Sequence, residues 1–111
     1  MNDAPIPTAV FLSGSGRTLA NLIEHRDTNG LPIDIRLVIS SSSKVRGVGI
    51  ARDAGIDTRV VRKSECPDPI DYAEAMFGPC RDLNIELVVM AGFLKHVLIP
   101  RDFEGRVINI H

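Results

Sequence analysis

Short runs of apolar residues alternate along the chain with longer stretches in which apolar positions recur every three or four residues. A short apolar run predicts a buried strand, and the wider spacing predicts a helix packed on one side. The predicted strands cover residues 9–12, 33–40, 58–61, 85–91 and 106–110. The predicted helices cover residues 17–26 or 17–27, 44–54 and 70–83, and residues 93–100 form a turn or a short helix. Pro79 lies inside the third helix, so we expect a break there, because an interior proline removes a backbone hydrogen bond.

The alternation of strands with helices predicts an α/β fold, a Rossmann-like parallel sheet with helices on both faces. The 111 residues are enough for one small domain, and we find no internal repeat or linker. Residues 1–7 contain two prolines and are expected to be a loose lead-in. We therefore predict a single domain spanning residues 1–111.

A glycine-rich turn follows the first strand. Residues 13–16, with the sequence SGSG, aim backbone N–H groups and the positive end of the following helix dipole at one place. Such a place attracts phosphate or another anion, and Arg17 and Thr18 would add a cation and a hydroxyl donor. The turn matches neither the dinucleotide fingerprint, whose third glycine is missing, nor a Walker loop. The alternative is a purely structural turn between strand and helix.

Composition and charge limit the partners and the cell compartment that we expect for this domain. The formal net charge is −1, so no global positive field recruits nucleic acid or a membrane surface. No apolar run reaches the roughly 20 residues of a membrane helix, and the first residues do not form a secretory signal. Cys66 and Cys80 lack metal or redox spacing, so we expect no metal site and two reduced thiols in a cytoplasmic protein. Cys80 is expected to pack in the core.

The last three residues carry the strongest catalytic suggestion. Asn109 and His111 are two positions apart in a predicted strand, so both side chains point to the same face. A carboxamide N–H beside an imidazole suits a reaction in which negative charge grows on a carbonyl oxygen and a proton is moved near neutral pH. The alternative is a histidine that only caps a backbone group at the end of the strand.

Three segments together resemble the folate-dependent formyltransferases. They are residues 11–19 (FLSGSGRTL), 88–95 (VVMAGFLK) and 107–111 (VINIH), and the glycine turn favours the branch that acts on glycinamide ribonucleotide. The resemblance to the phosphoribosylglycinamide formyltransferase family runs over nearly the whole chain and implies the N-terminal half of the formyltransferase fold. It implies transfer of a formyl group from 10-formyltetrahydrofolate to the amine of glycinamide ribonucleotide in purine biosynthesis.

The resemblance also implies roles for single residues on the acceptor side. Gly16, Arg17 and Thr18 match the loop that holds the substrate phosphate, although the family usually has serine and asparagine where this chain has Arg17 and Thr18. Asn109 and His111 match the catalytic pair: Asn109 would hydrogen-bond the oxyanion, and His111 as imidazolium would stabilise the same oxygen and help protonate the leaving nitrogen.

On the donor side, the resemblance implies contacts with the folate. The matching residues are Leu94, Lys95, His96, Val97 and Asn109. Leu94 and Val97 would face the pterin, and Lys95 replaces a more usual arginine. Another arginine that some family members use near the folate falls near Pro69 here.

The family continues well past the position of His111, with a further strand, a loop that carries a catalytic aspartate, and a long helix. For this chain we expect an open edge at the last strand, marginal stability or self-association, and phosphate binding that survives better than catalysis. Two other functions stay open: a formyltetrahydrofolate deformylase, which uses water as the acceptor, and a non-catalytic module that binds a phosphate or a nucleotide.

Overall fold

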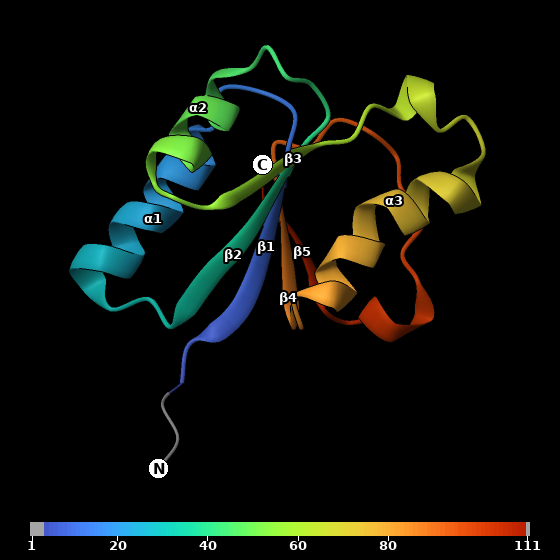
Figure 1. Ribbon diagram of the computed structural model, residues 1–111. Coiled ribbons are helices and arrows are strands. Elements are labelled where there is room, and N and C mark those ends of the chain that lie inside the picture. Colours follow the sequence, from blue (N-terminus) through green and yellow to red (C-terminus); the bar gives the residue numbers. More distant parts are fainter. Residues whose placement is uncertain (1–3, 111) are drawn as a thin grey trace.

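The computed structural model describes residues 4–110 and shows one parallel sheet of five strands with helices on both faces (Figure 1). The strands are β1 (Ile6–Leu12), β2 (Ile33–Ser40), β3 (Asp57–Val60), β4 (Leu87–Ala91) and β5 (Val107–Ile110). The helices are α1 (Arg17–Asn29), α2 (Arg46–Asp53) and α3 (Pro69–Asp82), with short 3-10 turns η1 (Lys63–Glu65) and η2 (Arg101–Phe103). The α/β prediction is thereby confirmed.

The strands lie in the order β3-β2-β1-β4-β5, which places β1 at the centre of the sheet. The chain first builds outwards to β2 and β3, and then crosses to the other side of β1 to form β4 and β5. In such sheets ligands bind beyond the carboxyl ends of the strands, at the point where the direction of building reverses. Here that point lies between β1 and β4.

Two apolar layers hold the sheet between its helices. Helices α1 and α2 cover one face, over a core that includes Val10, Leu12 and Leu19, whereas α3 covers the other face, over Phe11 and Phe77. These five side chains are fully buried. Both faces of β1 are therefore apolar, which explains the continuous apolar run that begins at Ala9.

Strand β2 begins with alternating apolar and polar residues and continues as an apolar run, and this change of pattern has a structural cause. The register between β1 and β2 shifts after Thr8–Ile35, so that Ala9 pairs with Leu37 and Arg36 is the extra residue of a bulge. Side chains alternate along a strand, and one extra residue reverses which face they reach. Accordingly Ile35 joins the α1–α2 core and Leu37 joins the α3 core. The guanidinium of Arg36 stays exposed and pairs with Asp34 at 2.7 Å.

The N-terminal prediction is corrected at two residues. Strand β1 begins at Ile6, so Ile6 and Pro7 belong to the sheet and not to a loose lead-in. The N–H of Ile6 donates to the carbonyl of Pro32 at 2.9 Å, and the carbonyl of Pro7 accepts from the N–H of Glu86 at 2.8 Å. Pro7 is tolerated because proline loses only its donor and keeps its acceptor.

Helix α3 runs through Pro79 without a break, so the expected interruption is wrong. Pro79 lies in the last turn, where only the hydrogen bond from its own missing N–H is lost, and its carbonyl still accepts from the N–H of Leu83 at 3.1 Å. Met76, Phe77 and Cys80 surround the proline and are fully buried, so packing holds the turn in helical geometry.

Other boundaries differ by a few residues, and residues 93–100 form no helix. Helix α1 extends to Asn29 and ends at Gly30, whose φ of +69° provides a left-handed C-cap. Within residues 4–110, no helix has both the length and the apolar character that crossing a membrane requires.

Candidate active site

The glycine turn is shaped by a close contact with a second helix. Gly16 precedes α1 with a φ of +78°, and a Cβ on it would lie 2.5 Å from the Cα of Gly47 and 3.1 Å from the Cδ1 of Ile50 in α2. Gly47 in turn packs on Leu12, and its N–H lies 3.4 Å from the carbonyl oxygen of Gly14. Gly16 is therefore required by the packing of this turn against α2.

The start of α1 keeps the properties of an anion site. No side chain caps its N-terminus, so the first-turn amides have no side-chain acceptor. Arg17 is exposed and Thr18 is half-buried, and neither side chain forms an ion pair or hydrogen bond within the described part of the chain. The phosphate-binding roles of Gly16, Arg17 and Thr18 stay predictions.

Ser13 joins three of the loops that leave the carboxyl edge of the sheet. Its Oγ accepts a hydrogen bond from the N–H of Leu94 at 2.9 Å and another from the Oγ of Ser41, also at 2.9 Å. The three residues follow β1, β4 and β2, whose last residues are in register with one another. The Oγ of Ser13 thus accepts two hydrogen bonds that hold these three loops together.

The residues that the resemblance implies as folate contacts all line one cavity. It has a volume of about 230 Å³ and is lined by Met90, Phe93, Leu94, Lys95, His96, Val97, Ile99 and Asn109. Asn109 is exposed on β5, where it pairs with Met90 of β4. The wall is thus mostly apolar, with a carboxamide at one side. His111, the other half of the proposed catalytic pair, lies outside the described residues.

A second cavity adjoins the first and contains a residue that the sequence reasoning missed. It has a volume of about 280 Å³ and is lined by Lys63, Pro69, His96, Val97 and Leu98, so it shares His96 and Val97 with its neighbour. The Nζ of Lys63 donates to the carbonyl of His96 at 3.1 Å and lies 5.7 Å from the ring centroid of Tyr72. Its place just after a parallel strand was the available signal, since such loops face the ligand edge.

The electrostatics of the two cavities favour an anionic ligand. Lys63 and Lys95 contribute positive charge, and no carboxylate lines either cavity within residues 4–110. Behind this wall, burial raises the pKa of Tyr72, whose hydroxyl finds no hydrogen-bond partner among the described atoms. Burial likewise raises the pKa of the Cys80 thiol to about 12, which makes Cys80 an inert core residue, as the sequence suggested.

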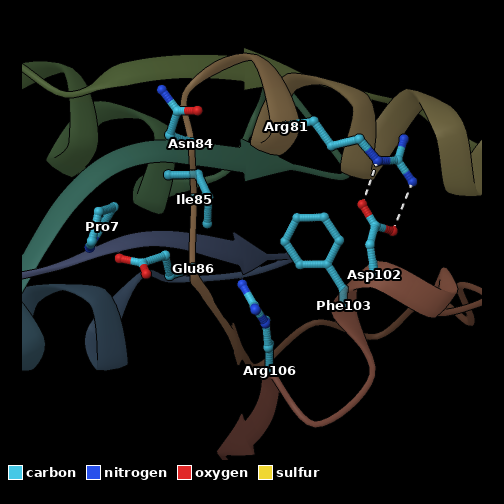
Figure 2. A pocket seen from close by; sticks show the side chains of 8 residues that line it. All are labelled: Pro7, Arg81, Asn84, Ile85, Glu86, Asp102, Phe103 and Arg106. Carbon is cyan, nitrogen blue, oxygen red and sulfur yellow. Dashed lines mark hydrogen bonds and ion pairs between the residues drawn. The ribbon is translucent and has the colours of Figure 1, made fainter.

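A larger cavity lies at the opposite edge of the sheet, near the start of β1, β4 and β5 (Figure 2). It has a volume of about 520 Å³, but none of the suggested site residues lines it. Arg81 of α3 forms two bonds with Asp102 of η2, at 2.7 and 3.1 Å, and pairs with Glu74 at 2.9 Å. Because Arg81 is already neutralised, it ties η2 to α3 and has no charge left for a ligand.

Metal ligands do not cluster in the described part of the chain. Residues 4–110 contain no group of three or more His, Cys, Asp or Glu side chains that could hold a metal ion.

Comparison with known proteins identifies the family to which this chain is similar. The model of the formyl transferase family matches residues 7–111. The trifunctional purine biosynthetic protein adenosine-3 of Gallus gallus is 31% identical over 108 residues, which cover 96% of this chain and 11% of that protein. A phosphoribosylglycinamide formyltransferase structure from Coxiella burnetii is 31% identical with a TM-score of 0.86, over 96% of this chain and 51% of that one.

A third match bears on the deformylase alternative. The structure of a formyltetrahydrofolate deformylase from Pseudomonas putida has a TM-score of 0.84 but is only 20% identical, and it covers all of this chain and 40% of that one. That likeness shows the fold alone. The chain spans about half the length of the Coxiella burnetii structure and a small part of the Gallus gallus protein.

Proposed function

This chain belongs to the formyl transferase family, and from that premise we propose that it transfers a formyl group from 10-formyltetrahydrofolate to the amine of glycinamide ribonucleotide. One observation carries the proposal: the cavity that joins Asn109 to residues 94–97 opens at the same edge as the glycine turn, and Ser13 links the two loops directly. Relatives that are 31% identical are named for this step or for the purine pathway, which favours it further.

The acceptor phosphate binds at the glycine turn in this proposal. The uncapped first turn of α1 offers backbone N–H groups and the positive end of the helix dipole. Arg17 adds a cation where the resemblance would place a serine, so the charge of the phosphate is matched by a side chain as well as by the backbone. The contact between Gly16 and Gly47 fixes this turn against α2 before any ligand arrives.

The folate donor binds in the cavity lined by residues 94–97. Leu94 and Val97 supply apolar contacts to the pterin, and Met90, Phe93 and Ile99 complete the wall. The two adjoining cavities, about 230 and 280 Å³, together reach the size of a small-molecule site, roughly 300–1,000 Å³. Their two lysines suit a ligand whose tail carries carboxylates.

The chemical step is direct transfer between the two ligands. The acceptor amine attacks the formyl carbon, the carbonyl oxygen becomes an oxyanion, and the amine nitrogen loses one proton, which balances the proton that the folate nitrogen gains. Asn109 donates a carboxamide N–H to this oxygen, and His111 as imidazolium stabilises it and helps deliver a proton to the folate nitrogen. The intermediate then collapses, the bond from the formyl carbon to that nitrogen breaks, and formylated acceptor and tetrahydrofolate leave.

The test is an Asn109→Ala variant assayed for formyl transfer in the protein as it is encoded. Losing one oxyanion donor lowers turnover by about 10²–10³-fold. The side chain of Asn109 is exposed, so the variant should keep its fold and its thermal unfolding midpoint. Asn29→Ala is the matched control, since Asn29 is an exposed asparagine at the last position of α1 and lines neither of the two adjoining cavities.

The product separates the proposal from its alternatives. With both ligands present, a glycinamide ribonucleotide formyltransferase yields formylated acceptor, a deformylase yields free formate, and a binding module yields neither. Wild-type turnover by Asn109→Ala would remove the carboxamide from the mechanism. Formate as the only product would mean that water, and not the amine of glycinamide ribonucleotide, accepts the formyl group.

A further inference from the structure

Phe93 and Val97 anchor the loop that lines the proposed donor cavity to the core, but within the described part of the chain its residues form no hydrogen bonds with one another. Residues 93–100 form neither helix nor strand, and Leu94, Leu98 and Ile99 are 81%, 55% and 45% exposed. A segment without internal hydrogen bonds keeps a fixed shape only where other parts of the chain hold it.

Two hydrogen bonds from elsewhere in the fold hold this loop. At its start, the Oγ of Ser13 accepts from the N–H of Leu94 at 2.9 Å. Two residues later, the carbonyl of His96 accepts from the Nζ of Lys63 at 3.1 Å. Between Leu94 and Ile99 these are the only hydrogen bonds that reach another segment within residues 4–110.

Lys63 is well placed to act as the second support. It begins η1, three residues after the carboxyl end of β3, and its Nζ lies 5.7 Å from the ring centroid of the buried Tyr72. The side chain forms no ion pair in the described part of the chain, so no carboxylate competes with the carbonyl of His96 for the ammonium.

We propose that Lys63 is a positioning residue of the donor site, which acts by holding the carbonyl of His96 and thereby the shape of residues 94–97. The inference rests on the proposed function, because it takes these residues as the wall of the folate site. His96 and Val97 line both cavities, so one hydrogen bond at His96 sets the shape of the two together. Without it, the loop must be ordered when the donor binds, and that ordering weakens affinity.

The experiment compares two ligands and three variants in the full-length protein. The ligands are tetrahydrofolate and tetrahydropteroate, which share the pterin but differ in the glutamate tail. The variants are Lys63→Met, Lys63→Arg and Lys44→Met, the last being the same change at an exposed lysine whose side chain forms no hydrogen bond or ion pair with any described residue.

If Lys63 positions the loop, Lys63→Met should raise the dissociation constants of both ligands by about three- to tenfold, since a hydrogen bond typically contributes a factor of this size. Lys63→Arg keeps a charged donor and should restore most of the affinity, and Lys44→Met should match wild type within about twofold. In turnover, the KM for the donor should rise while the KM for the acceptor stays the same. A purely structural role would move both, together with the unfolding midpoint.

Each other result overturns the inference. A loss confined to tetrahydrofolate would mean that Lys63 contacts the glutamate tail and does not position the loop. Equal binding by Lys63→Met and wild type, or no recovery by Lys63→Arg, would remove the hydrogen bond from the explanation and leave the proposed function intact. A wild-type protein that binds neither ligand would overturn the proposed function as well.

Discussion

Gly16→Ala tests how the fold builds the edge that carries the site. The added Cβ would lie 2.5 Å from the Cα of Gly47 and 3.1 Å from the Cδ1 of Ile50. The first neighbour is backbone and cannot rotate away, so α2 must shift or the turn must open. The substitution also places an alanine at a φ of +78°, where only glycine is unstrained.

The magnitude follows from two separate costs. Left-handed backbone costs an L-residue about 1–2 kcal/mol, and forcing extra volume into a packed contact costs about 1–3 kcal/mol more. Gly16→Ala should therefore lower the free energy of unfolding by roughly 2–5 kcal/mol, which is a large share of the ~5–15 kcal/mol typical of a domain.

Two other glycines separate these costs. Gly30 has a φ of +69° and no atom within 4 Å of the place that a Cβ would take, so Gly30→Ala should show the backbone cost alone. Gly14 has neither a positive φ nor a neighbour within 4 Å, so Gly14→Ala should stay within about 0.5 kcal/mol of wild type. Urea unfolding followed by far-UV circular dichroism measures all three. A Gly16→Ala variant no less stable than Gly30→Ala would refute the contact with α2 as a determinant of the fold.

Two further predictions concern pH and the sheet edge. Burial raises the pKa of Cys80 from 9.0 to about 12, so the folded chain keeps a proton that the unfolded chain loses in this range. This contribution to stability is complete below pH 9 and falls as the pH rises towards 12, by roughly 1.4 kcal/mol per pH unit, and urea unfolding of Cys80→Ala should show a shallower decline. When residues 1–111 are prepared as a separate polypeptide, β5 lies at an edge of the described sheet with Ile108 49% exposed, so sedimentation velocity should show association that grows with concentration and that Ile108→Lys suppresses. A single monomer at every concentration, or equal pH slopes for wild type and Cys80→Ala, would contradict these two expectations.

Local patterns were enough to predict most of the fold. Strand β2 has the predicted bounds because Pro32 precedes its apolar run and serines follow it. The order of strands and helices predicted a parallel sheet, and parallel connections place all the strand ends at one edge. The family resemblance named residues 94–97 and Asn109 as contacts of one ligand, and the structure places them around one cavity.

The errors arose where packing outweighs local preference. The continuity of α3 through Pro79 depends on the burial of Met76, Phe77 and Cys80, which no local signal reports. The early start of β1 depends on partners in two other segments, because Ile6 and Pro7 bond to Pro32 and Glu86.

By itself the sequence determined the alternation of strands and helices, the glycine turn and the chemical groups available at the carboxyl edge, because these follow from hydrophobic spacing and residue type. Only the tertiary structure decided that Gly16 packs against Gly47, that the Oγ of Ser13 accepts hydrogen bonds from two other loops, and that the Nζ of Lys63 donates to the carbonyl of His96. The residues in these contacts are 28 to 81 positions apart in the sequence. Whether such residues touch is decided by how the helices and the sheet pack together.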